Sequence, residues 1–368
     1  MPTAHHSVRR LLTALSLGAA ALLIPVVDGL AQAQAPASAA GASAAGAPPA
    51  AGGGGRGGRG GGPAKTWWVE KFNAGAYKAP MRPLWKLSDL KAMHAGQHTW
   101  STQIIRDLYQ DVTYQSAAPG TKFNPRIHPN TPMSIVVTGG QINFNIEGQQ
   151  PFTAKRGSIV LVPAHRLYSY DVPGNEDALF VVTHNLDYQT LYPSAEPAPR
   201  ATGGGQVIQV SWNNTPQAYP AGQLPHWNLF DAIAACQPMG VKVRVDHIQF
   251  QPLLGWFNPA DNKCEAGGRG NAPAAAPSPI DTKGTTFGHL HKGPAEWWIV
   301  QAGQIQGNFE NQGTFLAIEG DVLYAQPDMW HQMYAVGPSG PSVRLAAYGA
   351  LGPNLGNTAN AGRGAGGD

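Results

Sequence analysis

The sequence predicts an all-β protein with two copies of one β-domain, flanked by terminal segments of low complexity. Short apolar runs alternate with polar residues and are broken by Gly, Pro, Asn and Asp. A repeat relates the two halves at a constant spacing. Much of the glycine lies before Lys65 and after Gly352, which marks the terminal segments. The intervening stretch of about 285 residues suits two domains of ordinary size.

The first 33 residues have the pattern of a secretory signal peptide. A positive start at Arg9-Arg10 precedes an apolar run over 11–27, and the small residues Ala31 and Ala33 fit the −3 and −1 positions of a cleavage site. A membrane anchor is the alternative, but Pro25 and Asp28 make the run short for a span. We therefore expect a periplasmic or secreted protein with no stable membrane span after cleavage. The arginine pair leaves twin-arginine export open as a second route.

The segments outside the predicted domains are expected to be flexible. Residues 34–65 are mostly Ala, Gly and Pro and cannot bury enough apolar surface to offset their ordering entropy, and residues 353–368 are similar. A nucleic-acid-binding glycine-arginine tail is the alternative for the first of them, but it holds only Arg56 and Arg59. The net charge of +3 also excludes the strongly basic surface of a nucleic-acid-binding protein.

Two cysteines, Cys236 and Cys264, remain in the expected mature chain. An even number of cysteines in an oxidising compartment predicts a disulfide. Metal ligation is the alternative, and it is less favoured because neither cysteine has a close cysteine neighbour in the sequence.

The middle of the chain is expected to consist of short antiparallel strands. β-branched and aromatic residues recur at a period of two, with turn residues every 8–12 positions, which is typical of sandwiches and barrels. The only helix expected lies within 87–95. The clearest strands are at 134–137, 141–145, 157–163, 297–300, 304–306 and 321–324.

Adding 163 to positions in the first half gives matching residues in the second half. Gly140 corresponds to Gly303 (140 + 163 = 303), Phe152 to Phe315, and Gly157 to Gly320. Two copies indicate a duplicated domain, since a solenoid needs more repeats. We expect one domain over 66–205 and the other over 206–352.

The second copy carries a metal-ligand pattern. His289 and His291 are two residues apart, so a strand would point both to the same face. Glu296 follows after a short turn, and His331 would come from a later strand beside the first. Three imidazoles and one carboxylate suit Fe, Mn, Co, Ni, Cu or Zn, whereas Ca²⁺ or Mg²⁺ would need more oxygen ligands. The spacing therefore predicts one divalent transition metal.

With these residues the chain resembles the cupin superfamily. The first cupin motif, His-x-His followed by Glu and Gly, is matched by His289, His291, Glu296 and Gly303, and the second by Gly320 and His331. Gln326 and Asp328 stand where that second motif usually has Pro and Gly. The resemblance covers about residues 86–352. It implies a bicupin of two tandem jelly-roll barrels, with one mononuclear metal that has open positions for water or substrate.

The first copy lacks the ligand set. Subtracting 163 from the four predicted ligands gives Arg126, His128, Met133 and Tyr168, of which only His128 is a ligand type. We expect this copy to be metal-free and to serve packing. The alternative is that Arg126, His128 and Tyr168 form a small pocket for an anionic or phenolic ligand.

Further residues are candidates for the surroundings of the metal. His247 could transfer protons beside it, or could be an ordinary hydrogen-bonded histidine. The candidates for a substrate pocket are Trp298, Met329, Met333 and Gln249, although such residues also fill ordinary β-cores. The insertion at 256–284 leads into His289 and is expected to be either a lid or a plain surface loop.

The resemblance implies a metalloenzyme that acts on a small-molecule substrate. The favoured function is a metal-dependent dioxygenase for a small organic, possibly phenolic, compound, in which Glu296 could also detach to act as a base. The alternatives are a non-oxidative lyase, decarboxylase or isomerase, and a non-catalytic ligand-binding bicupin. The sequence determines neither the metal, the substrate nor the oligomeric state.

Overall fold

The computed structural model describes residues 68–197, 199, 205–219, 225–231, 257–258, 263–264, 288–293, 295–336, 343–348 and 355–356. The chain divides into two compact units, residues 1–60 and 61–368, and every described residue belongs to the second. The predicted signal peptide and linker, together with Cys236, His247 and Gln249, lie outside the described residues. The predicted disulfide therefore stays a prediction.

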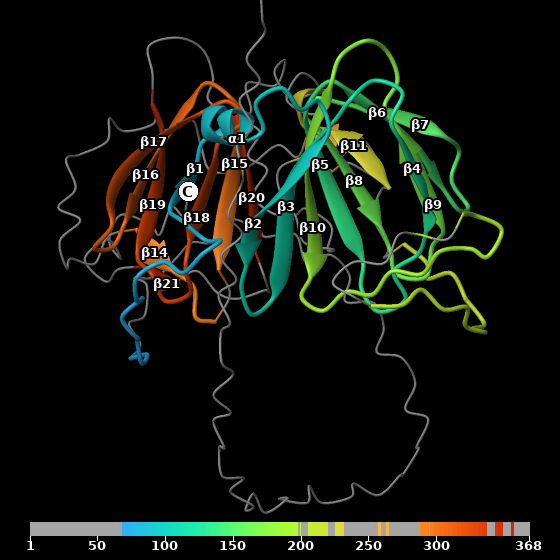
Figure 1. Cartoon of the computed structure of the whole chain (residues 1–368). Helices are drawn as coiled ribbons and strands as arrows, with labels where there is room; N and C mark the ends of the chain where they lie inside the picture. The colour runs from blue at the N-terminus through green and yellow to red at the C-terminus, as the bar shows by residue number, and fades with distance from the viewer. Residues whose placement is uncertain are drawn as a thin grey trace, which may run out of the picture. The chain divides into compact units, whose positions relative to one another are not determined.

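The described residues form twenty-one strands and one α-helix of four or more residues, which confirms that the chain is β-rich (Figure 1). The helix α1 (Leu87–Met93) falls within the predicted stretch. The strands of the first half are β1 (Leu84–Trp85), β2 (Trp100–Arg106), β3 (Gln110–Ala117), β4 (Lys122–Arg126), β5 (Met133–Gly139), β6 (Gln141–Ile146), β7 (Phe152–Lys155), β8 (Ser158–Val162), β9 (Tyr168–Asp171) and β10 (Ala178–Asn185).

The strands of the second half are β11 (His226–Asn228), β12 (Phe257–Asn258), β13 (Lys263–Cys264), β14 (His289–Leu290), β15 (Glu296–Ala302), β16 (Gln304–Phe309), β17 (Gly313–Ile318), β18 (Val322–Ala325), β19 (His331–Val336), β20 (Val343–Tyr348) and β21 (Leu355–Gly356). Within the predicted insertion, β12 pairs with β13. Within the predicted tail, β21 pairs with β14, so this part of the tail is ordered as a strand.

Each half contributes a pair of open antiparallel sheets. The first half has the orders β11-β8-β5-β10-β3-β2 and β4-β9-β6-β7. The second half has the orders β1-β18-β15-β20 and β17-β16-β19-β14-β21. An apolar cluster links the two sheets of each half: Phe144 and Phe180 belong to the first cluster, and Trp298 and Phe309 to the second. These sheets are not closed on themselves, so the two jelly-roll barrels remain an expectation.

The strand bounds and registers repeat at the spacing seen in the sequence. β5 shifted by 163 gives β15 (133 + 163 = 296, 139 + 163 = 302), and β6 shifted by 163 gives β16 (141 + 163 = 304, 146 + 163 = 309). Ile142 pairs with Ala154, as Ile305 pairs with Ala317. Gly140 between β5 and β6 has a φ of 65°, and a Cβ there would lie 2.5 Å from a backbone oxygen, so the turn requires glycine.

A second repeat, which the sequence reasoning missed, ties the halves together. Residues 83–89 read Pro-Leu-Trp-Lys-Leu-Ser-Asp and residues 225–231 read Pro-His-Trp-Asn-Leu-Phe-Asp. Each segment adds a short strand to the sheet of the other half: Trp85 pairs with Val322 on β18, and Trp227 pairs with Ile159 on β8. Its spacing is 142 residues (225 − 83 = 142), so it is out of step with the main repeat by 21 residues (163 − 142 = 21).

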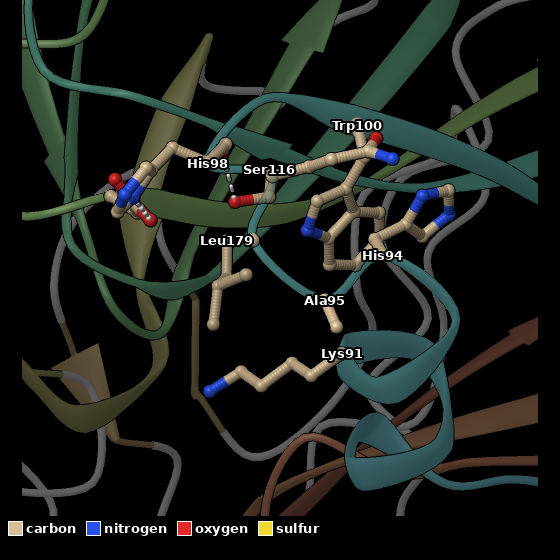
Figure 2. Close-up of a pocket in the computed structure, with 10 residues that line it drawn as sticks. Lys91, His94, Ala95, His98, Trp100, Ser116 and Leu179 are labelled. Atoms are coloured by element: carbon tan, nitrogen blue, oxygen red, sulfur yellow. Dashed lines mark hydrogen bonds and ion pairs between the residues drawn. The ribbon is translucent and has the colours of Figure 1, made fainter. Parts of the chain in front are cut away.

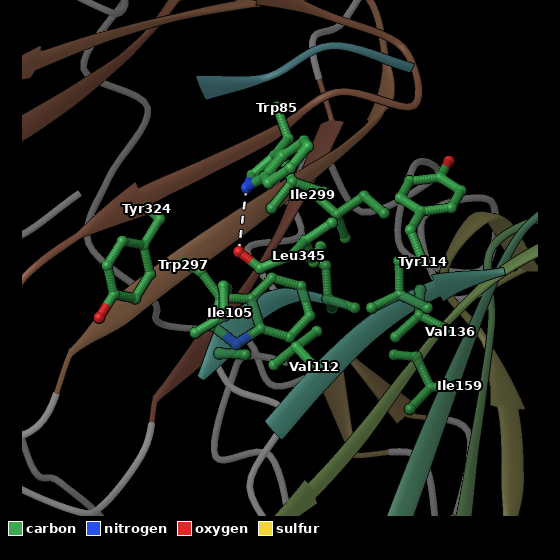
Figure 3. Packing of buried hydrophobic residues seen from close by; sticks show 14 of the residues in the cluster. Trp85, Ile105, Val112, Tyr114, Val136, Ile159, Trp297, Ile299, Tyr324 and Leu345 are labelled. Atoms are coloured by element: carbon green, nitrogen blue, oxygen red, sulfur yellow. Dashed lines mark hydrogen bonds between the residues drawn. The ribbon is translucent and has the colours of Figure 1, made fainter. Parts of the chain in front are cut away.

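A third apolar cluster joins residues of both halves (Figure 3). Val112 and Tyr114 of β3 belong to it together with Trp297 and Ile299 of β15. The Trp297 Nε1–H donates a hydrogen bond of 3.0 Å to Gln110 Oε1, which satisfies the one polar atom of the indole ring. The core is therefore continuous across the predicted domain boundary.

Candidate metal centre

Four buried side chains converge in the second half, as the sequence predicted. His289 lies on β14, His291 follows it, Glu296 begins β15 and His331 begins β19. His289 and His331 are direct partners in the β14–β19 register, which brings their rings together. All four side chains are buried, and one ligand atom from each lies within 4.8 Å of the others.

The distances between the ligand atoms match the edges of a metal coordination shell. Glu296 Oε2 lies 2.8 Å from His291 Nε2, 3.0 Å from His331 Nε2 and 3.7 Å from His289 Nε2. His331 Nε2 and His289 Nε2 are 3.2 Å apart. Bonds of about 2.1 Å to one ion would put neighbouring ligand atoms about 3.0 Å apart in an octahedron and about 3.4 Å apart in a tetrahedron. The four residues therefore fit a single transition-metal ion.

The charges of the cluster also suit a cation. Burial acts to raise the pKa of Glu296, but the neighbouring imidazoles of His289, His291 and His331 outweigh it and hold the pKa well below its usual value. Burial lowers the pKa of His331. The His331 Nδ1–H donates to Met329 O at 2.9 Å, which orients the ring with Nε2 toward the cluster, where it would be the atom that takes a metal ion. The result is an ionised carboxylate buried among three imidazoles, a set whose negative charge a divalent ion would offset.

Local backbone contacts hold the two ligand-bearing loops together. Asp328 has a φ of 61°, the left-handed conformation that favours glycine. Its N–H donates to His291 O at 2.9 Å, and its carboxylate accepts from Lys292 Nζ at 2.8 Å. Asp328 thus forms this turn and also pairs with Lys292.

An N-terminal arm, residues 68–83, lies against these loops, and no sequence pattern had indicated it. Lys71 forms an ion pair of 2.8 Å with Glu310, and the Phe72 ring lies 4.6 Å from the Lys292 ammonium. Gln326 Nε2 donates to Gly75 O at 3.2 Å. The arm therefore contacts the loops that follow His291 and precede His331.

The predicted pocket residues that the structure describes are core residues beside the cluster. Trp298 is buried, and its ring centroid lies 5.2 Å from that of His331. Met329 and Met333 are buried in the same apolar cluster as Trp298. These side chains place apolar surface on one side of the His–Glu cluster, and their contact with a substrate stays a prediction.

The first half holds the four counterpart residues at the positions that the repeat predicts. His128 Nε2 lies 2.7 Å from the Tyr168 hydroxyl, and that hydroxyl lies 3.3 Å from Met133 Sδ. Arg126 lies near these residues at the end of β4. Within the described part of the chain, the second-half cluster is the one group of three or more His, Cys, Asp or Glu side chains placed to share an ion.

A separate pocket of about 330 Å³ lies beside α1 (Figure 2). It contains none of the four converging residues. The His94 ring stacks on the Trp100 indole at 4.8 Å along one wall, and Lys91 and Leu179 line another part.

No helix among the described residues has the length and apolar character needed to cross a membrane.

The comparisons with known proteins find similarity in structure. No family model matches the chain, and no curated protein matches it. Salicylate 1,2-dioxygenase from Pseudoaminobacter salicylatoxidans, solved as adducts with gentisate, aligns over 72% of this chain and 79% of its own, with 11% identity and a TM-score of 0.44. A double-stranded β-helix protein from Klebsiella pneumoniae aligns over 26% of this chain and 85% of its own, with 15% identity and a TM-score of 0.24.

A third similar structure is the DMSP lyase DddQ from Ruegeria pomeroyi. It aligns over 27% of this chain and 54% of its own, with 14% identity and a TM-score of 0.25. These are similarities of fold at low sequence identity, and no activity follows from them.

Proposed function

We propose that the chain is an exported bicupin metalloenzyme, a dioxygenase for a small organic substrate, with its metal in the second half only. The observation that carries this proposal is the buried convergence of three imidazoles on one ionised carboxylate, at spacings that fit a single ion. The fragment of sequence that holds these residues also carries the two cupin motifs. The two halves would be the two cupin domains, with limits near those expected from the sequence.

His289, His291, Glu296 and His331 would hold the ion. A bound transition metal would supply open positions for dioxygen or for oxygens of the substrate, as a redox centre or a Lewis acid. Glu296 Oε2 is within hydrogen-bond distance of two histidine nitrogens, so this carboxylate is oriented by the ligands themselves. Trp298 and the two methionines keep bulk water away from one side of the cluster.

Replacing the carboxylate tests the metal site. Glu296→Gln removes the one negative charge while keeping the shape, so we expect metal affinity to fall by at least about 100-fold, with loss of activity. Metal content after dialysis and titration with Mn²⁺ or Fe²⁺ measure this. Glu319→Gln is the control, because Glu319 is a half-exposed carboxylate paired with Arg156. Equal metal affinity in the Glu296→Gln variant and the wild type would contradict the assignment.

Oxygen dependence separates the proposed dioxygenase from the other functions. Protein purified from its native compartment would be analysed for metals and screened with small phenolic compounds for oxygen uptake. We expect turnover to stop without oxygen. Turnover that persists under anaerobic conditions would instead identify a lyase, decarboxylase or isomerase. Ligand binding that survives metal removal, with no turnover in any condition, would identify a binding protein.

Export has its own test. N-terminal sequencing of the protein recovered from its native compartment should give a mature chain that begins just after Ala33. A mature chain that still begins at Met1 would contradict signal-peptide cleavage.

A further inference from the structure

The first half has a cluster of polar and aromatic side chains where the second half has its metal ligands. Arg126 stands at the place of His289 (289 − 163 = 126), and His128, Met133 and Tyr168 at the places of the other three. Residues 128 and 168 are in direct contact, as are the corresponding residues of the metal cluster region. The duplication therefore placed a second set of side chains at an equivalent site with different chemistry.

The hydrogen bonds of His128 show that this set does not offer lone pairs to a metal. Its Nδ1 lies 2.7 Å from Gln189 O, a carbonyl that only accepts, so Nδ1 carries the proton. Burial lowers the pKa of His128, so the ring is neutral and its Nε2 accepts from the Tyr168 hydroxyl at 2.7 Å. Burial also raises the pKa of Tyr168 well above its usual value, so the phenol stays protonated.

Arg126 gives the cluster a permanent positive charge. Its Nε donates to Asn124 O at 3.0 Å. Within the described part of the chain, no carboxylate forms an ion pair with Arg126, and its terminal nitrogens have no hydrogen-bond partner. Its guanidinium carbon lies between aromatic rings, 5.7 Å from the centroid of Tyr170 and 5.8 Å from those of Phe123 and Tyr192.

His184 on β10 adds an unpartnered polar atom to the same cluster. It lies opposite Met133 in the β5–β10 register, and its ring centroid is 4.6 Å from that of His128. The side chain is buried, and its Nδ1 has no hydrogen-bond partner among the described residues. A buried polar atom without a partner is unfavourable, so a ligand that pairs with it gains affinity. The half-exposed Tyr188 stacks on its ring at 3.8 Å and borders the cluster toward solvent.

We propose that this first-half cluster, Arg126, His128, Tyr168, His184 and Tyr188, binds a small organic carboxylate with a planar apolar body. The guanidinium would take the carboxylate through two parallel N–H donors, and the Nδ1 of His184 would supply a third polar contact. The rings of Tyr188, Phe123 and Tyr192 suit a planar group beside the charge. A metal ion is disfavoured here, because the site contains a fixed cation and no carboxylate.

Benzoate binding to the full-length protein tests this proposal. The protein would first be stripped of metal with a chelator, so that benzoate cannot bind at a metal ion. We expect saturable binding of one benzoate per chain in calorimetric titration. Arg126→Gln should weaken it by at least about tenfold, since hydrogen bonds to charged groups are worth about 1.5–3 kcal/mol. Arg344→Gln, an arginine on β20 in the second half, is the matched control and should bind as the wild type does.

Further variants keep the proposal falsifiable if Arg126→Gln does not fold. His184→Phe retains the stacking on Tyr188 but removes Nδ1, so it should also weaken benzoate binding. Glu296→Gln should leave benzoate binding unchanged, which separates this site from the proposed metal centre. The proposal fails if benzoate does not bind at millimolar concentration, if a folded Arg126→Gln variant binds it equally well, or if uncharged benzamide binds as tightly as benzoate.

Discussion

At the residue scale, the two equivalent clusters carry side chains of opposite charge. In the second half the ionised Glu296 is buried among histidines, which favours a cation. In the first half Met133 takes its place, and Arg126 supplies the charge. The same strand geometry therefore presents a negative donor set in one half and a positive one in the other. This contrast depends on a few side chains and leaves the backbone pairing unchanged.

The buried His184 predicts how stability depends on pH. Burial and the neighbouring His128 and Arg126 lower its pKa to about 3. Between about pH 6.5 and about pH 3, the imidazole of His184 is protonated in the unfolded chain and neutral in the folded chain. The free energy of unfolding therefore falls as the pH falls, by about 1.4 kcal/mol per pH unit for this one group.

The His184→Phe variant measures this contribution in metal-free protein. On going from about pH 6 to about pH 5, the free energy of unfolding measured in urea should fall in the wild type by about 1 kcal/mol more than it falls in the variant. His98→Phe is the control, because that ring is exposed and its pairing with Asp177 lies at the surface, where such a pair contributes little. An identical pH dependence in wild type and His184→Phe would show that the imidazole is protonated in the folded state.

At the scale of elements, short segments from one half complete the sheets of the other. β1 extends the sheet of β18, and β11 extends the sheet of β8. The equivalent backbone bonds, Tyr324 N to Pro83 O and Leu161 N to Pro225 O, show that both junctions use one arrangement. The N-terminal arm before β1 continues along the second half to the loops that carry the candidate metal ligands. These elements make the candidate metal centre depend on residues far away in the sequence.

Removing one hydroxyl tests how firmly the arm is attached. The Tyr77 hydroxyl donates to Tyr324 O at 2.7 Å and lies 3.4 Å from Met329 Sδ, two residues before His331. Tyr77→Phe should lower the free energy of unfolding by about 1 kcal/mol, because the carbonyl of Tyr324 loses this partner. Tyr109→Phe, at a partly exposed tyrosine, should change it by less than about 0.5 kcal/mol. Equal effects in urea unfolding would mean that this hydrogen bond of the arm contributes no more to stability than a partly exposed hydroxyl does.

At the scale of the described molecule, the two halves share one apolar cluster, so we expect them to unfold together. Trp85, Trp297 and Tyr324 belong to this cluster together with side chains of β2, β3 and β10 (Figure 3). The Tyr324 hydroxyl donates to Asp107 Oδ2 at 3.2 Å, so a polar contact also crosses between the halves. The Trp85 Nε1–H donates to Ile104 O at 2.9 Å, which ties β1 to β2. A core of this kind favours joint unfolding of both halves.

Truncating a central side chain of this cluster tests that coupling. Trp297 is fully buried, so Trp297→Ala should cost about 3–5 kcal/mol through lost burial and the cavity left behind. We expect calorimetry to show one unfolding transition in the wild type and one, at lower temperature, in the variant. Trp68→Ala, at a fully exposed tryptophan, should leave the transition in place. Two separate transitions, with only one of them shifted, would show that the halves unfold independently.

The sequence by itself determined the β-rich fold, the repeat of 163 residues and the identity of the four converging residues. It could do so because strand periodicity, turn glycines and ligand spacing are local properties of the chain. Only the tertiary structure showed the arm at the ligand loops, the exchange of β1 and β11, and the unpartnered nitrogen of His184 beside Arg126. These depend on contacts between segments tens to hundreds of residues apart, and strand registers and packing decide such contacts without leaving a short-range pattern in the sequence.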